Sequence, residues 1–156
     1  MSDSAKRDAS EVSRIADQLR RVCDGGAWLG PSLKEVLSGV DEDRARRRPI
    51  ARAHTIWELV LHVTAWIRIA RERLSATETR GHTDRENWPP MASSWQDTLA
   101  LLEREIDALE EAILAFPSER LDDDAPAPEP QTFYVLLHGV VQHIAYHAGQ
   151  IAVLQK

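Results

Sequence analysis

The sequence predicts an all-α protein, a four-helix bundle with one or two long crossover connections. Four segments of about 15 to 25 residues repeat apolar residues at intervals of three and four, as amphipathic helices do. No segment shows the alternation typical of a β-strand. Residues 39–54 and 117–131 are long connections that allow a topology other than simple up-down-up-down. Four amphipathic helices bury their apolar stripes by packing against one another.

Composition points to one ordinary globular domain. The chain has 156 residues, of which 43% are hydrophobic and 28% are charged. We expect a single domain over residues 1–156, with residues 1–8 forming a flexible tail. The net charge of −6 disfavours a nucleic-acid-binding protein, which needs excess positive charge to displace phosphate counterions.

Targeting signals are not evident. The N-terminal segment lacks the apolar stretch of a secretory signal, and no apolar run reaches the ~18 residues of a membrane span. We therefore expect a cytoplasmic protein without a membrane or nucleic-acid partner. The single cysteine, Cys23, excludes an internal disulfide and a Cys-rich zinc site, and we expect it to be buried and inert.

The first two helices are expected at residues 9–24 and 33–37. Gly25-Gly26 ends the first, since glycine readily adopts left-handed conformations. Ser32 is the expected N-cap of the second. Residues 41–49 form a charged connector with four arginines, which we interpret as solvated or, alternatively, as a patch that captures an anion or cofactor: Arg44, Arg46, Arg47 and Arg48.

The next long helix begins sharply at a capping box. Thr55 and Glu58 each satisfy a free backbone N–H of the first turn. The apolar face then continues to about residue 79, and residues 81–90 are expected to be a loop. This helix carries His62 and Trp66 beside its apolar stripe.

The last two helices are separated by a proline-rich connection. One helix follows Ser93 or Ser94 and ends at Pro117. Residues 122–130 are rich in proline and aspartate and exclude a helix. The final helix follows Thr132 and runs to the C-terminus, with these residues on its buried side: Phe133, Leu136, Leu137, Val140, Ile144, Ala148 and Ile151.

Two histidines of the final helix lie one turn apart beside its apolar centre. At ~100° per residue, His143 and His147 share a face, and this i, i+4 spacing lets two imidazoles bind one ion. Such pairs also occur by chance, so a metal site and a hydrogen-bonded pair both remain open. His138 falls on the opposite side and is expected at the surface. Position 144 is Ile, which excludes the HExxH pattern of metallopeptidases.

His62 borders the apolar stripe of its helix and faces a groove between helices. By itself such a histidine is more typical of a hydrogen-bonded boundary residue than of a metal ligand. Combined with His143 and His147 it would give three nitrogen ligands and a free fourth position, the pattern of catalytic zinc.

Several neighbours are secondary candidates. Glu58 is expected as a capping residue, or alternatively as a group that orients water near the metal. Gln150 lies close in angle to His143 and could accept a hydrogen bond from a ligand imidazole. The remaining aromatic and histidine residues have mainly structural expectations: Trp57 in packing or a dimer, Trp66 in the core or a pocket wall, Tyr146 at a rim, His54 in solvent or at the site mouth, and His82 without a role.

Two segments resemble a known family. TIWELVLHV contains His62, and HIAYHAGQI is similar to an H-x-x-x-H-x-G-Q signature. With the order of the helices, they make residues 9–156 resemble the DinB/YfiT-like superfamily of metal-binding four-helix bundles. One departure is Ala148, where many members carry Arg before the Gly-Gln pair.

The resemblance implies a divalent metal, usually zinc or nickel, held by His62, His143 and His147. It also implies a bundle with a long crossover and a homodimer. Relatives include mycothiol-dependent maleylpyruvate isomerase and bacillithiol S-transferases, so a low-molecular-weight thiol is a possible second cofactor.

The resulting functional prediction is a metal-dependent thiol S-transferase or a related hydrolase acting on a small molecule. A tri-histidine metal is a Lewis acid that lowers the pKa of a bound thiol or water. The alternatives are a non-catalytic metal-binding or sensing module and a plain helical interaction protein. A cavity of a few hundred Å³ beside the site would favour an enzyme.

Overall fold

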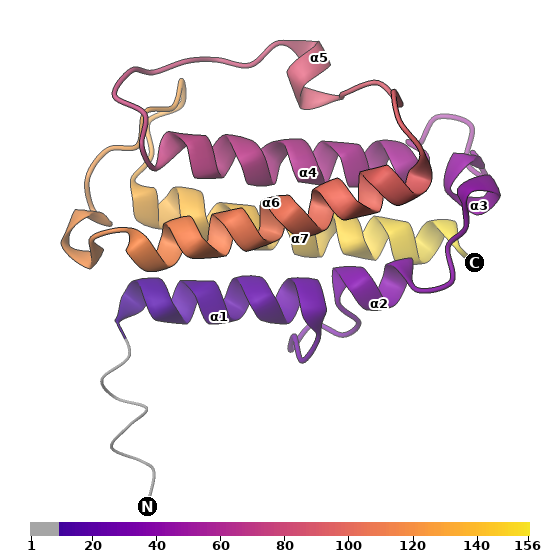
Figure 1. Cartoon of the computed structure of the whole chain (residues 1–156), viewed down its shortest axis with the longest axis horizontal. Coiled ribbons are helices and arrows are strands. Elements are labelled where there is room, and N and C mark those ends of the chain that lie inside the picture. The colour runs from indigo at the N-terminus through magenta and orange to yellow at the C-terminus, as the bar shows by residue number, and fades with distance from the viewer. Residues whose placement is uncertain (1–9) are drawn as a thin grey trace, which may run out of the picture.

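Four long helices lie side by side in the computed structural model, which describes residues 10–156 (Figure 1). They are α1 (Glu11–Asp24), α4 (Ile56–Arg73), α6 (Trp95–Ala115) and α7 (Phe133–Leu154). The described part of the chain contains helices and no strand, so the predicted all-α bundle is confirmed. The predicted flexible tail over residues 1–8 lies outside the described residues.

The helices α1 and α7 run in one direction, and α4 and α6 run in the other (Figure 1). Trp57, near the start of α4, donates from Nε1 to Oγ1 of Thr98, near the start of α6, at 3.0 Å. Arg71, further along α4, has its Nη2 atom 3.1 Å from Oε2 of Glu105, further along α6. Because α4 and α6 are parallel, their connection, residues 74–94, must cross the length of the bundle. The connections 39–54 and 117–131 each turn at one end instead.

Three short helical segments and one 3-10 turn occupy the connections: α2 (Leu33–Leu37), α3 (Glu42–Arg46), α5 (Asp84–Asn87) and η1 (Ser118–Arg120). The prediction of α2 and its Ser32 cap is confirmed. The connector 41–49 and the loop 81–90 were expected to lack helices, and the structure places α3 and α5 there. Helices of four or five residues are too short to show an apolar stripe, and the sequence indicates α2 through its Ser32 cap instead.

Two helix boundaries differ from the prediction. The first helix begins at Glu11, where Ser10 accepts a hydrogen bond from the N–H of Ser13. The helix α4 ends at Arg73 rather than near residue 79, because residues 75–80 are exposed and have no bundle face to pack against. The predicted capping box of Thr55 and Glu58 is present.

The core runs the length of the bundle, and α4 is buried around most of its circumference. Trp57 is fully buried and therefore serves packing. No helix in residues 10–156 is long and apolar enough to cross a membrane.

Candidate metal centre

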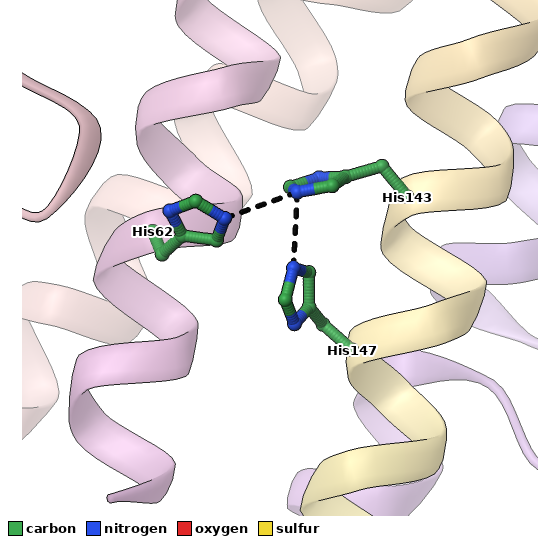
Figure 2. Close-up of side chains that lie close together, drawn as sticks. All are labelled: His62, His143 and His147. Carbon is green, nitrogen blue, oxygen red and sulfur yellow. Dashed lines mark hydrogen bonds between the residues drawn. The ribbon is translucent and has the colours of Figure 1, made fainter. Parts of the chain in front are cut away.

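Three histidines from two antiparallel helices converge in the bundle. His62 projects from α4, and His143 and His147 project from α7, one turn apart (Figure 2). The His62 and His147 residues are each 6% exposed, and His143 is partly buried. The structure thus brings together the three histidines that the sequence singled out.

Their Nε2 atoms point at one another (Figure 2). The distance from His143 Nε2 is 3.1 Å to His62 Nε2 and 3.0 Å to His147 Nε2. One ligand atom from each of the three residues lies within 4.8 Å of the others, so the group could hold a metal ion.

Hydrogen bonds on the far side of two rings fix which nitrogen carries the proton. His62 Nδ1 lies 2.7 Å from the backbone oxygen of Asn87, which only accepts, so Nδ1 is the donor. His147 Nδ1 lies 2.6 Å from Gln150 Oε1, while Gln150 Nε2 donates to the Tyr146 hydroxyl at 3.3 Å. In the neutral rings both Nε2 atoms therefore present electron pairs to the centre.

His143 Nε2 contacts the Nε2 atoms of both other histidines. A neutral His143 ring carries at most one proton on this nitrogen, so at most one of the two contacts can be a hydrogen bond. Its Nδ1 is buried and has no hydrogen-bond partner. Three convergent nitrogens with at least two free electron pairs are a donor set that fits a borderline-soft divalent metal such as zinc or nickel.

Burial keeps the three imidazoles neutral. It lowers the pKa of His143 to about 3, with the neighbouring His147 and His62 adding to the effect. Burial also lowers the pKa of His62 and of His147, although the hydrogen bonds to Asn87 and Gln150 oppose it. Neutral imidazole is the form that binds a metal.

The end of α5 closes over His62. The Trp88 ring stacks on His62 with a centroid separation of 3.9 Å and an interplanar angle of 10°. Its other face stacks on His54 at 3.6 Å. Asn87 Oδ1 also accepts from Trp66 Nε1 at 2.7 Å. These contacts fix the ring of His62 in place.

Asn87 and Trp88 are site residues that the sequence analysis missed. The available signal was the pair Thr83 and Glu86, which forms a capping box and predicts a short helix inside the presumed loop. No sequence pattern indicates that this helix returns to His62.

Of the two secondary candidates, Gln150 contacts the site and Glu58 does not. The partner of Gln150 is His147 rather than His143, which lay nearest in angle. The Glu58 carboxylate instead accepts from the Thr55 N–H and from Arg48 Nη2. Burial raises the pKa of Glu58, but these two donors outweigh it and hold the pKa below its ordinary value.

The other histidines lie outside the cluster. His138 is partly exposed, with Nε2 3.7 Å from a Glu11 oxygen. The half-exposed His54 belongs to the Trp88 stack, so it is more than a solvated loop residue. His82 Nε2 accepts from Arg73 Nη2 at 2.7 Å.

Three further features singled out from the sequence have structural roles. Burial raises the pKa of Cys23 to about 12, as expected for an inert thiol.

The arginines of residues 44–48 do not form one charged patch. Arg46 pairs with Glu42, Arg48 pairs with Glu58, and Arg44 donates to the backbone oxygen of Gln155. Ala148 is 1% exposed, so this position contributes packing rather than charge.

A cavity of about 400 Å³ opens beside the cluster between α4 and α7. His62 and His143 line it, together with Trp66 and Asn87. A second hollow of about 650 Å³ is lined by His54, Tyr146 and Gln150 but by none of the three clustered histidines. Of these two, the smaller cavity is the one that reaches the cluster.

Comparison with known families agrees with this geometry. The sequence pattern of the DinB superfamily matches residues 30–151, which include all three histidines. The chain belongs to the DinB superfamily. The match leaves out α1, although α1 packs against α6 and α7 in the DinB bundle. Searches among curated proteins and among solved structures gave no match.

Proposed function

We propose that this DinB-superfamily protein binds one zinc or nickel ion through the Nε2 atoms of His62, His143 and His147, and uses it in thiol transfer or hydrolysis. The observation that carries the proposal is the convergence of three Nε2 atoms, two of which are left unprotonated by hydrogen bonds elsewhere. A purely hydrogen-bonded cluster would need a proton for each contact.

A bound metal would supply Lewis acidity that lowers the pKa of a thiol or water. The chain itself supplies orientation. Asn87 and Gln150 hold the proton on Nδ1 of His62 and His147, and Trp88 keeps the His62 ring from turning. Because the ligand set has only three protein donors, a fourth position is left for a reactant.

The cavity favours catalysis over a closed, non-catalytic metal-binding module. Its volume of about 400 Å³ lies in the range of small-molecule sites. Its lining is mainly apolar, which suits the exclusion of water from a reaction. A sensing module remains the second candidate, and an activity assay separates it from an enzyme.

Metal content tests the binding step. Elemental mass spectrometry on untagged protein should find close to one zinc or nickel per chain, and His143→Ala or His147→Ala should lose it. His138→Ala, on the same helix and outside the cluster, is the matched control and should keep it. Equal retention in all three variants would overturn the ligand assignment.

Thiol transfer is tested with the zinc-loaded protein. Mycothiol, bacillithiol or cysteine is mixed with monochlorobimane, which fluoresces when a thiol displaces its chloride. A rate above the uncatalysed reaction that disappears in His143→Ala would support a transferase. Three expectations stay predictions: a small-molecule substrate, a cytoplasmic location and a homodimer. Sedimentation velocity tests whether the protein is a dimer.

A further inference from the structure

The far end of the cavity contains a buried positive charge without a counterion. Arg73, the last residue of α4, is only 7% exposed and lines the same cavity as His62 and His143. Within residues 10–156, it takes part in no ion pair, and its Nε atom is buried without any hydrogen-bond partner. A buried guanidinium normally requires a carboxylate or phosphate partner.

The neighbours of Arg73 do not neutralise it. One Nη2 proton goes to the neutral acceptor His82 Nε2. Burial lowers the pKa of Arg73, and the like charge of Arg80 adds to this effect. Glu72 and Glu78 line a separate hollow of about 60 Å³ on which Arg73 also borders, but neither pairs with it.

The cavity has a charged end and a metal-ligand end, with an apolar wall between them. On α4, His62 and Arg73 are eleven residues apart, about three turns or roughly 16 Å along the axis, so they lie on the same face. Ala70 lies between them on that face, and α7 supplies Leu136 and Val140 opposite.

Space for a ligand is made on the α7 side by Gly139. A Cβ built there would meet no atom within 4 Å, so the helix has room beside it at this point. Glycine inside a helix costs roughly 1 kcal/mol relative to alanine. Here it keeps open a wall of the cavity.

We infer that the cavity binds an organic carboxylate with an apolar body, its acid group at Arg73 and its other end near His62 and His143. The inference rests on the proposed function, because it assigns the cavity to the substrate of that site. The planar guanidinium matches a carboxylate, and one uncompensated positive charge matches one negative charge. Arg73 is thus a substrate-binding and specificity residue, not a metal ligand.

The test is calorimetric titration of hexanoate, with hexanamide as the uncharged analogue. It uses the full chain in metal-free form, so that a carboxylate bound directly to a metal is not mistaken for one bound at Arg73. We expect hexanoate to bind roughly tenfold or more tightly than hexanamide, as for a charged hydrogen-bonded pair. Arg73→Gln should remove this preference.

Two further variants define the location. Arg68→Gln removes a partly exposed arginine of the same helix and should keep the preference for hexanoate. Gly139→Leu should weaken hexanoate and hexanamide alike by filling the cavity, even if Arg73→Gln were to fold poorly. Zinc content, measured in parallel, should remain near the wild-type value in Arg73→Gln.

The outcomes separate this inference from the metal proposal. Equal hexanoate binding in wild type and Arg73→Gln, no binding at millimolar hexanoate, or binding seen only with zinc would overturn the inference and leave the metal centre intact. Hexanoate binding that depends on Arg73 in a protein that never takes up zinc or nickel would support the anion site and overturn the metal proposal.

Discussion

Trp88 lies flat against His62, with ring centroids 3.9 Å apart and planes inclined by 10°. Its backbone neighbour Asn87 accepts the Nδ1 proton of the same imidazole. A four-residue helix in the crossover thus determines both the orientation and the tautomer of a histidine from α4. This contact makes the crossover part of the candidate metal centre.

Trp88→Ala should weaken zinc binding by about tenfold, because residues that orient a ligand histidine typically contribute one to two orders of magnitude in affinity. The measurement is competition against a chromophoric zinc chelator. Trp28, which is fully exposed, provides the matched control, and Trp28→Ala should bind zinc as the wild type does. Identical affinities for both variants would show that the stack does not support the site.

Gln150 should have a comparable effect through His147. Gln150→Ala removes the acceptor of the Nδ1 proton and should lower zinc affinity by about 10- to 100-fold, whereas Gln150→Glu keeps an acceptor and should retain binding. Gln142 is exposed on the same helix, and Gln142→Ala is the control. Unchanged affinity in Gln150→Ala would contradict a role in orienting His147.

Glu58→Gln should leave metal content unchanged and reduce stability by about 0.5 kcal/mol at neutral pH. Glutamine can still serve the capping box, but the charged contact with Arg48 is lost. Chemical denaturation measures the difference. Loss of metal in this variant would instead assign Glu58 to the site.

The same variant has a defined pH dependence. The pKa of Glu58 is lowered in the folded protein, so the unfolded chain takes up its proton first as the pH falls. Its stabilising effect is therefore present at neutral pH and is lost below about pH 4, where the ordinary carboxyl titrates. The stability gap between wild type and Glu58→Gln should close over that range, and a gap that widens would contradict the ion pair.

Cys23 should not react with Ellman's reagent at pH 8 in the folded protein. Burial raises its pKa to about 12, so the thiol is both protonated and inaccessible, and reaction should require unfolding in guanidinium chloride. Ser75→Cys places a thiol at an exposed position and should react at once. Rapid reaction of Cys23 in the wild type would show that α1 opens readily.

The predictable parts of the site are those set by helical periodicity. His143 and His147 share a face because of their spacing, and His62 is placed by the amphipathic pattern of its own helix. That α4 and α7 are neighbours does not follow from the stripes alone, because in a four-helix bundle each helix has two adjacent helices and one diagonal to it. Gln150 lies closer in angle to His143 but contacts His147, because side chains three residues apart are neighbours on a helix surface and an angle alone ignores the rise between turns.

The unpredicted parts depend on how distant segments meet. The contact of Asn87 with His62 joins the end of α5 to a residue of α4 that lies 25 positions earlier, and no local pattern encodes it. The role of Arg73 could not be predicted from the sequence either, because a charged residue near a helix end normally faces solvent. In the structure Arg73 is buried and donates a hydrogen bond to His82, a residue of the crossover.

The parallel course of α4 and α6 makes the connection between them long. A bundle whose successive helices alternate in direction would link α4 to α6 by a tight turn of a few residues. Such a turn would sit at the Arg73 end and leave the His62 ring uncovered. The contacts of Asn87 and Trp88 with His62 thus depend on the direction of α6. A connection too short to cross the bundle would remove these contacts and also reverse α6.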